Sequence, residues 1–410
     1  MKNNDYRTMR WLLLLAVMLL LNACSDDAPS DQNKERVEVE LMPCTSSYID
    51  VEESQATRAW TPPTPYVTYD NINSPFKNQK NLVNNDIDIF FTQNGKEPLE
   101  GTFFYRQAYG DTPATWRLSL EDLIADDYYL YGFIPKEDAE SATIAPYDTY
   151  EDGAVLTIHG LNTVTPSDVC VLIGAKEGSG MESDATTDAE SNTLRLRPGA
   201  FKTKIKTTGV AGNNFVYLLF DHIYAALRFR FKVDPIYGAL RTIRLRRLEL
   251  IAYKDGSQGA VSAKFDAVIK LKANTTGGSP IEEVTFTPVA ASASVPRVTI
   301  FEWDGTAANE VTLRTDAPAD FMGCFVPGDN TYFKLFSTYD VYDNNTSIDP
   351  KGNLIRQGCE AENTIDLRKM FGNDLTTTRG HSYSLTLTVQ PTYLYMLSDP
   401  DLDNPTVTVQ

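Results

Sequence analysis

The sequence predicts an all-β protein built from two tandem β-sandwich domains. Short segments in which apolar and polar residues alternate recur along most of the chain, residues that favour turns separate them, and helical periodicity is nearly absent. Many short strands separated by turns are typical of sandwiches, whereas a parallel α/β fold needs a helix between strands. No repeat of fixed period is visible, so neither a propeller nor a solenoid is expected.

Composition narrows the class of function. The 410 residues include 42% hydrophobic residues, with 21 Tyr and 19 Phe, which is ample for packed cores, and the length favours two or three domains. A net charge of −18 argues against a nucleic-acid partner, because such binding needs clustered cations. The same charge suits a soluble surface protein that repels its own copies. Three His in 410 residues argue against a zinc site and a His-dependent enzyme, and because no paired carboxylates or other catalytic parts stand out, we expect no enzyme, no metal and no cofactor.

The N-terminus carries a secretory signal. Lys2 and Arg10 precede an apolar stretch over residues 11–21, and Ala23 and Cys24 follow. This stretch is too short to cross a hydrocarbon core of about 30 Å, which takes roughly 20 residues. A Cys directly after the cut resembles a bacterial lipobox, so we expect a signal peptide over 1–23, cleavage between Ala23 and Cys24, and acylation of Cys24. The alternative is an ordinary signal peptide with a Cys nearby by chance.

Such an anchor would hold the mature protein on a membrane without a span. Acyl chains contribute about 0.8 kcal/mol per buried methylene, so two or more give durable binding. The acidic pair Asp26 and Asp27 after Ser25 resembles the surface-export signal of Bacteroidales lipoproteins. A flexible tether is the alternative reading of this polar stretch.

The first half of the chain reads as a series of strands. Val37, Val39 and Leu41 alternate with Glu, which predicts a half-buried strand over 37–41, and the Pro-rich residues 61–79 predict a loop. The segment 120–125 could form at most one or two helical turns, and the polar residues 174–193 predict a long exposed loop. Further strands are expected at 87–91, 103–105, 116–120, 128–135 and 169–173.

A second β-rich half is expected to begin near Phe201, with the domains meeting between about 195 and 215. We therefore divide the chain into the signal peptide, a tether with a first strand at 24–58, and sandwich domains at 59–205 and 206–410. Arg241, Arg244, Arg246 and Arg247 predict the solvated face of an antiparallel sheet. Strands are expected at 215–231, 240–251, 284–286, 298–301, 332–336 and 383–389.

Motifs that carry chemistry are weak. His222 has no nucleophile in an elbow such as GxSxG nearby, so a structural His is the better interpretation. Asp399, Asp401 and Asp403 have the spacing that opens a calcium loop, but Asn404 replaces the expected Gly and the chain ends too soon for the closing Glu, which favours a solvated turn. The segment 178–180, Gly-Ser-Gly, lacks the flanking strand and helix of a phosphate-binding loop.

Cysteine spacing leaves two readings open. Beyond Cys24 the chain holds Cys44, Cys170, Cys324 and Cys359, with no CxxC pair. In an exported protein Cys324 and Cys359 could form a disulfide, and buried free thiols are the equal alternative.

Taken together, several of these features resemble the fimbrillin family, whose members are subunits of lipoprotein-precursor (type V) pili. Trp116 and the segment 128–135 are similar to a core strand of its N-terminal domain. The segment 220–231, with Phe-Asp-His before an alternating strand, resembles the opening of its C-terminal domain. With the lipobox and the acidic pair, the resemblance covers essentially the whole chain. It implies two transthyretin-like sandwiches and a pilus subunit or tip adhesin on the outer membrane.

The resemblance also implies how such a subunit assembles. The lipidated precursor is cut after an Arg by a trypsin-like protease, the first strand leaves a hydrophobic groove, and a strand of the next subunit fills it. Arg58 and Ala59 match that cut site, although Arg58 could simply lie in an exposed linker, and tip or anchor subunits need no cut. Val407 and Val409 in the terminal segment 405–410 are the candidate donor strand, or else the last strand of their own domain.

The resemblance implies other pilus subunits, the outer membrane and a host or bacterial surface ligand as partners.

Two rival functions make different demands on the structure. A surface glycan-binding lipoprotein would expose Trp60, Trp116 or Trp303 as a coplanar platform. A secreted hydrolase would need a cleft with titratable groups around His159, His222 or His381.

Overall fold

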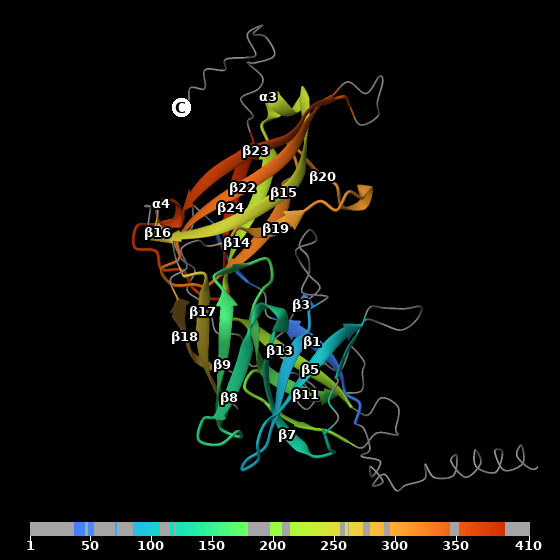
Figure 1. The fold of residues 1–410 in the computed structure, drawn as a ribbon, viewed down its shortest axis with the longest axis vertical. Helices are drawn as coiled ribbons and strands as arrows, with labels where there is room; N and C mark the ends of the chain where they lie inside the picture. Colours follow the sequence, from blue (N-terminus) through green and yellow to red (C-terminus); the bar gives the residue numbers. More distant parts are fainter. Residues whose placement is uncertain are drawn as a thin grey trace, which may run out of the picture.

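The fold is all-β, as the sequence predicts. The computed structural model describes residues 37–45, 48–52, 70–71, 85–106, 115–118, 120, 122–178, 197–206, 214–254, 259–260, 262–273, 279–290, 296–344 and 352–389. Strands dominate this part, and its helices are short: α3 (Pro235–Gly238), α4 (Leu367–Phe371) and the 3-10 turns η2 (Lys136–Asp138) and η3 (Ala307–Asn309). The strands form four sheets that pack as two pairs, and the two pairs lie end to end along the long axis of the molecule (Figure 1).

The first sheet has nine strands and closes on itself. They are β1 (Glu40–Thr45), β3 (Asp70–Asn71), β4 (Ile87–Thr92), β5 (Leu99–Arg106), β6 (Thr115–Leu118), β7 (Asp127–Ile134), β11 (Cys170–Gly178), β12 (Lys202–Lys204) and β13 (Phe215–His222). The order is β11-β13-β1-β6-β5-β4-β7-β12, with β3 beside β1. Because β7 also pairs with β11, the strands form a ring around one apolar core.

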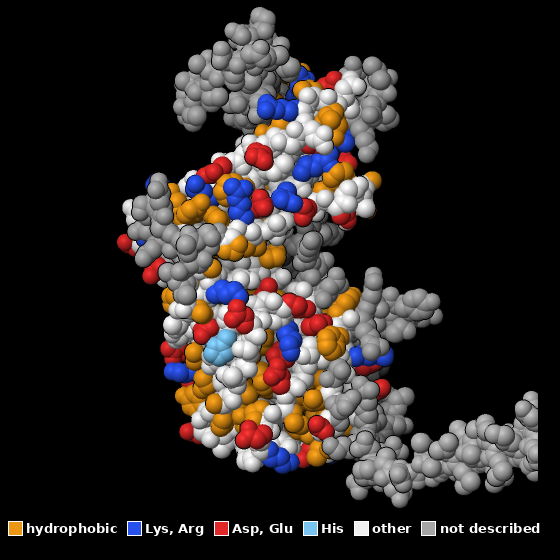
Figure 2. Space-filling view, viewed as in Figure 1, with side chains coloured by type: hydrophobic (Ala, Val, Ile, Leu, Met, Phe, Trp, Pro, Cys, Tyr) orange, Lys and Arg blue, Asp and Glu red, His pale blue; other side chains and the backbone are white. Residues whose placement is uncertain are grey.

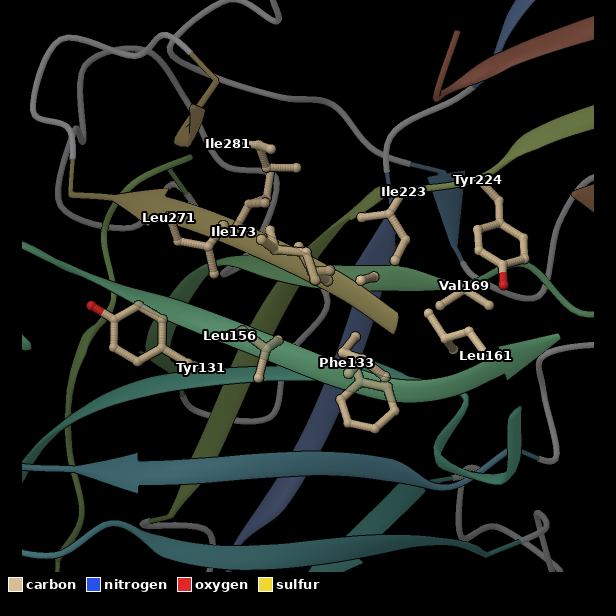
Figure 3. Close-up of a cluster of buried hydrophobic side chains, with 14 of the residues drawn as sticks. Tyr131, Phe133, Leu156, Leu161, Val169, Ile173, Ile223, Tyr224, Leu271 and Ile281 are labelled. Atoms are coloured by element: carbon tan, nitrogen blue, oxygen red, sulfur yellow. The ribbon is translucent and has the colours of Figure 1, made fainter. Parts of the chain in front are cut away.

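The second sheet covers one side of this ring. It contains β8 (Ser141–Pro146), β9 (Gly153–Asn162), β17 (Lys264–Lys272) and β18 (Ile281–Ala290), in the order β18-β17-β9-β8. Leu156 and Leu271 of this sheet pack against Phe133 and Ile173 of the ring (Figure 3). Since the ring also has its own core, β13 is buried along its whole length, which explains its apolar run over residues 215–220.

The third and fourth sheets form the other pair. The third has the order β10 (Val164–Thr165), β21 (Ala319–Phe325), β14 (Ala225–Val233), β24 (His381–Val389) and β2 (Ile49–Glu52). The fourth has the order β16 (Gly259–Ala260), β15 (Arg241–Lys254), β22 (Tyr332–Asp343) and β23 (Leu354–Asp366), with β19 (Val298–Glu302) and β20 (Val311–Leu313) also paired with β15. Leu227, Phe229 and Phe231 of β14 point into the core between them, as their alternation with Arg and Lys predicts.

The sheets do not follow the expected division into residues 59–205 and 206–410. β13 lies after the expected boundary, yet it belongs to the first sheet beside β11. β17 and β18 also come from the second half, yet they extend the second sheet through β9. The physical reason is burial: Phe265, Ala267, Ile269 and Leu271 form one apolar face of β17, and that face lies in the core over the ring. The two pairs of sheets are therefore interleaved in sequence.

Three smaller expectations are corrected. Residues 122–125 form no helical turn: the chain bends at residue 122 and again at 125–126, and between them only Leu123 is buried. Of the loop expected at 174–193, residues 174–178 belong instead to β11 and pair with β13, and the remainder lies outside the described residues. The basic strand is β15, but Arg244 on it is buried and pairs with Glu310 at 3.0 Å, so its face is not simply solvated.

A pH-dependent stability is expected from Asp138, which lies in η2 between the two pairs of sheets. Burial raises the pKa of Asp138 from 3.8 to about 6, although Thr165 Oγ1 donates a hydrogen bond of 2.9 Å to it. A carboxyl with a raised pKa stabilises the fold fully below about pH 4, and this contribution is lost as the pH rises through about 6. The free energy of unfolding of Asp138→Asn, relative to the parent, should therefore increase by up to about 3 kcal/mol as the pH rises from 4 to 7, as measured by urea unfolding. A stability difference that is flat across this range would contradict the assignment.

Candidate functional site: the N-terminal segment and its groove

The N-terminal segment, residues 37–52, lies inside the fold. β1 occupies the position between β13, to which it is parallel, and β6, to which it is antiparallel. Glu40 N–H donates to the Asn214 carbonyl at 2.9 Å, and Leu118 N–H donates to the Val39 carbonyl at 3.3 Å. Both edges of β1 are thus used, and the ring of the first sheet is continuous only while this strand is in place.

The apolar face of this segment matches the sequence prediction. Val37, Val39 and Leu41 are 4%, 2% and 1% exposed and lie in one core with Trp116 and Val216. Glu38 between them is exposed, and Glu40 pairs with Arg117 at 2.9 Å on the outside. The strand itself begins at Glu40, with residues 37–39 extended ahead of it.

The same segment continues into the other pair of sheets, which the sequence did not predict. β2 pairs in parallel with β24 at the edge of the third sheet, and Val51 packs against the core between the third and fourth sheets. Tyr48, between β1 and β2, stacks on the His222 ring at a centroid distance of 3.9 Å. One short stretch of chain therefore contributes a strand to each pair of sheets.

Removing this segment would open a groove with defined chemistry. Val37, Val39 and Leu41 each contribute roughly 1.5–3 kcal/mol when fully buried. Without them, the facing side chains of the ring would be open to water, and β13 and β6 would each present an unpaired backbone edge. An open edge beside apolar pockets is the geometry that accepts an added β-strand from a partner.

The edge of β24 is only partly covered. β2 pairs with residues 381–384, and among the described residues no strand pairs with 385–389 on that side. Beside this open half lies a cleft of about 270 Å³, bordered by Phe231, Leu245, Leu387 and Val389. The groove of the N-terminal segment thus ends at a cleft of mixed polar and apolar lining, between the third and fourth sheets.

Several predicted site residues lie outside the described part of the chain. These are Ala23 and Cys24 of the lipobox, Arg58 and Ala59 of the cut site, Trp60, the three Asp of the calcium-like turn, and the donor candidates Val407 and Val409. Leu385, Leu387 and Val389, which share the donor pattern, lie in β24 beside β14 and so belong to their own sheet.

The two candidate tryptophans that the structure describes, Trp116 and Trp303, do not make a glycan platform. Trp116 is buried, and its Nε1–H donates to the Asn85 carbonyl at 2.9 Å. Trp303 is half-buried, and the Arg246 guanidinium covers its face at 3.8 Å from the ring centroid. Buried or covered rings cannot stack on a sugar, so these two do not support the glycan-binding alternative.

His222 and its buried neighbours do not have the arrangement of a catalytic triad. His222 Nδ1 lies 2.5 Å from Asp168 Oδ2 and 3.5 Å from Cys170 Sγ, so both neighbours face the same ring nitrogen. A catalytic triad uses the two nitrogens separately. Burial also raises the pKa of the Cys170 thiol well above its usual value, whereas an activated nucleophile needs a lowered one. The side chains of Asp168, Cys170 and His222 are all buried. The sequence analysis did not predict that these residues come together.

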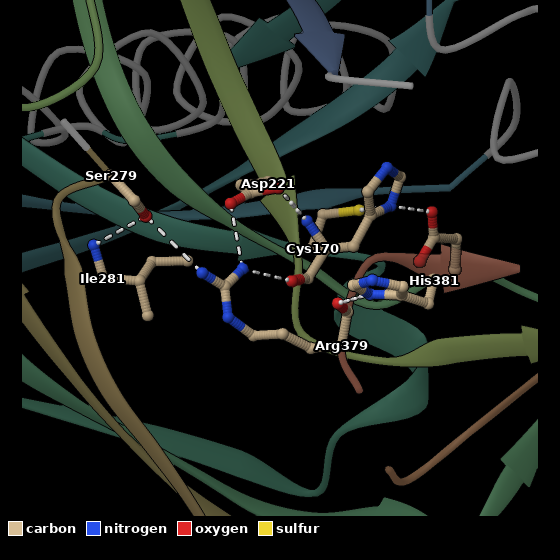
Figure 4. Close-up of polar contacts among 8 residues, drawn as sticks. Cys170, Asp221, Ser279, Ile281, Arg379 and His381 are labelled. Carbon is tan, nitrogen blue, oxygen red and sulfur yellow. Dashed lines mark hydrogen bonds and ion pairs between the residues drawn. The ribbon is translucent and has the colours of Figure 1, made fainter. Parts of the chain in front are cut away.

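Polar contacts near this cluster hold the ends of several strands together. Arg379 Nη1 donates to Asp221 Oδ2 at 2.9 Å and to the His222 carbonyl at 3.0 Å, and Nη2 lies 3.4 Å from Ser279 Oγ (Figure 4). His381 Nδ1 lies 3.0 Å from the Arg379 carbonyl. His159 pairs with Asp266 at 3.0 Å on the second sheet, away from these contacts.

Cys324 and Cys359 do not form a disulfide. Cys324 lies on β21 of the third sheet and Cys359 on β23 of the fourth, and both are buried free thiols, as is Cys170. The free-thiol reading of the sequence is therefore the correct one for these residues.

The outer surface shows charged and apolar side chains interspersed over both pairs of sheets (Figure 2). Cations on β15 and β22 are matched by acids or aromatic rings, as with Arg247 and Glu302 or Lys334 and Tyr253. Within the part of the chain that the structure describes, no helix is long and apolar enough to cross a membrane.

Comparison with known proteins gives structural neighbours only. No protein-family model and no curated protein matches this chain. Among solved structures it is similar to a candidate cell adhesion protein from Bacteroides fragilis, at 13% identity over 87% of this chain and 94% of that chain, with a TM-score of 0.35. It is also similar to a fimbrial protein from Bacteroides vulgatus, at 11% identity over 74% and 87% of the two chains, with a TM-score of 0.25. At these TM-scores the likenesses establish neither a shared family nor a shared function.

Proposed function

We propose that this chain is a structural subunit of a surface pilus, or its tip adhesin, made as a lipidated precursor and assembled by exchange of one strand. The observation that carries the proposal is the position of residues 37–52. They fill a gap between β13 and β6 and continue along β24, so their removal would open both pairs of sheets to a strand from another copy.

The N-terminal segment and the C-terminal segment of the sequence share the same alternation of Val with polar residues. Val37 and Val39 place alternate apolar side chains into the ring, and Val407 and Val409 near the C-terminus have the same spacing with Thr between them. A strand with side chains of this type and period could occupy the same pockets. The partner in assembly would therefore be a further pilus subunit.

Anchoring and processing complete the proposal. Cys24 would carry the acyl chains that hold the precursor at the outer membrane, after cleavage between Ala23 and Cys24. A cut between Arg58 and Ala59 would separate the N-terminal segment from the rest of the chain, which leaves that segment held only by non-covalent contacts. A host or bacterial surface ligand, and no nucleic acid, would then be the target of an adhesin form.

The proposal can be tested with the full-length precursor extracted from membranes in detergent. Intact mass should show acylated Cys24 as the N-terminal residue. Limited trypsin treatment should give a new N-terminus at Ala59, followed by slow formation of oligomer ladders on unboiled gels. Arg58→Ala should block both the cut and the ladder, whereas truncation after Asn404 should permit the cut and prevent the ladder.

Arg36→Ala is the matched control, because it removes a trypsin site on the other side of the same segment and leaves Arg58 intact. This variant should still assemble. If the protein cut at Arg58 stays monomeric under all conditions, the exchange of strands fails as an account of this groove, and a stand-alone adhesin becomes the better reading.

A further inference from the structure

Three metal-ligating side chains meet at the junction between the two pairs of sheets. Asp168, Cys170 and His222 each place a ligand atom within 4.8 Å of the other two, and all three are buried. Cys170 and His222 are opposite each other in the register of β11 and β13, so their side chains lie on the same face of neighbouring strands. The pairing of β11 with β13 therefore brings the ligand atoms of Cys170 and His222 together.

This cluster lies where the chain passes from one pair of sheets to the other. Asp168 lies in the short link between β10 of the third sheet and β11 of the first, and His222 ends β13 just before β14 of the third sheet. The chain thus crosses between the two pairs of sheets at both points. An ion held here would tie the two crossings to each other.

Two further groups border the cluster. The Tyr48 hydroxyl lies 3.6 Å from Cys324 Sγ, and its ring covers His222. Cys324 in turn comes from β21, so the third sheet contributes a sulfur atom to the surroundings of the site.

The charges of this cluster are incompletely matched by its protein contacts. Asp168 Oδ2 faces His222, and the Tyr48 hydroxyl and the Cys170 thiol also lie against this carboxyl group, but Asp168 Oδ1 is buried and meets no donor among the described residues in good hydrogen-bond geometry. A buried carboxylate oxygen without a partner is costly. A divalent cation would neutralise the Asp168 carboxylate together with a Cys170 thiolate, which leaves the buried cluster without net charge.

The distances fit a tetrahedral zinc site with a small adjustment. Zinc bonds of about 2.0–2.3 Å place neighbouring ligand atoms roughly 3.3–3.7 Å apart. The 3.5 Å between Cys170 Sγ and His222 Nδ1 already lies in that range. The 2.5 Å between Asp168 Oδ2 and His222 Nδ1 is a hydrogen-bond distance and would have to open by about 1 Å as the ion replaces the shared proton.

We propose that Asp168, Cys170 and His222 bind a structural zinc ion at the junction of the two pairs of sheets, with the remaining coordination position facing Tyr48 and Cys324. Binding releases the Cys170 thiol proton to solvent, while His222 binds through Nδ1 as a neutral imidazole that keeps its proton on Nε2, so zinc affinity rises with pH. A ligand set of one thiolate, one imidazole and one carboxylate suits zinc better than calcium or magnesium, which prefer oxygen ligands.

The test uses the full chain in detergent, without a polyhistidine tag, from cells grown with added zinc. Elemental analysis should find one zinc per chain. The same protein, unfolded with a chelator and refolded with cobalt, should show the sulfur-to-cobalt charge-transfer absorption of a thiolate ligand. Refolding with zinc should give a higher Tm than refolding with the chelator present.

Cys170→Ala and Asp168→Asn should each weaken zinc binding at least about tenfold. Cys359→Ala is the matched control. This other buried thiol lies in the core between the third and fourth sheets, so the variant should bind zinc like the parent. Parent protein without zinc, with another metal in its place, or with cobalt bound but no sulfur charge-transfer band would overturn the assignment. So would a folded Cys170→Ala protein that keeps its full zinc content.

Discussion

Leu41→Asp is expected to release the N-terminal segment from both sheets while most of the chain stays folded. Leu41 is 1% exposed and lies among apolar side chains, including Trp116 and Val216. A carboxylate there has no partner, and its burial costs several kcal/mol, which exceeds what one strand end can compensate. The neighbours of β1 keep other partners, β11 for β13 and β5 for β6, so the segment can detach alone.

Hydrogen exchange read by mass spectrometry should reveal this local release. Peptides that cover 215–222 and 115–118 should exchange at least about a hundredfold faster than in the parent, because their backbone groups lose β1, while 264–272 should keep its protection. Glu38→Gln is the control, since this neighbouring side chain is exposed. Loss of protection throughout both pairs of sheets would mean that the segment is an integral part of the fold, and no change at all would mean that Leu41 does not hold it.

Arg379→Ala is expected to lower the free energy of unfolding by about 3–5 kcal/mol. Arg379 is largely buried and bonds to the side chain of Asp221, to the His222 carbonyl and to Ser279, which come from β13 and from the link before β18. Without the guanidinium, the Asp221 carboxylate remains in a site that is 11% exposed, with less to balance its charge. Urea unfolding of the parent and the variant measures the difference.

A double-mutant cycle with Asp221→Asn separates the ion pair from simple packing. If loss of the guanidinium charge beside Asp221 causes the change, the double variant should be more stable than Arg379→Ala alone, because it no longer buries the Asp221 charge. Lys270→Ala removes the partner of Glu283 from an exposed pair and should change stability little, since water screens such pairs. Additive losses in the cycle would assign the effect to packing instead.

The strands of this fold were readable from the sequence where one face of a strand is buried. The alternation at 227–233 predicted the inward face of β14, and Val37, Val39 and Leu41 predicted the inward face of the N-terminal segment. These patterns work because side chains alternate between core and solvent with a period of two.

The partners of the strands could not be read in the same way. The alternation at 264–272 is equally clear, but nothing in it says that β17 pairs with β9 and not with a strand of its own half. β2 is four residues long with two acids, too short for a period to stand out, so its place beside β24 was missed. The cluster of Asp168, Cys170 and His222 depends on the register between β11 and β13, which only the folded chain defines.

The parallel pairing of the N-terminal segment also sets the order in which the chain can fold. Glu40 must wait for Phe215 before β1 has its neighbour, and Ile49 must wait for His381, which lies near the other end of the chain. Contacts between residues so far apart in sequence form late, because the entropy of closing the long loop is lost before they stabilise anything. We therefore expect the first strands of the described chain, β1 and β2, to be inserted last. An element that joins after the folding transition state affects mainly the rate at which it leaves, so the departure rate of this segment can change without slowing the folding of the rest.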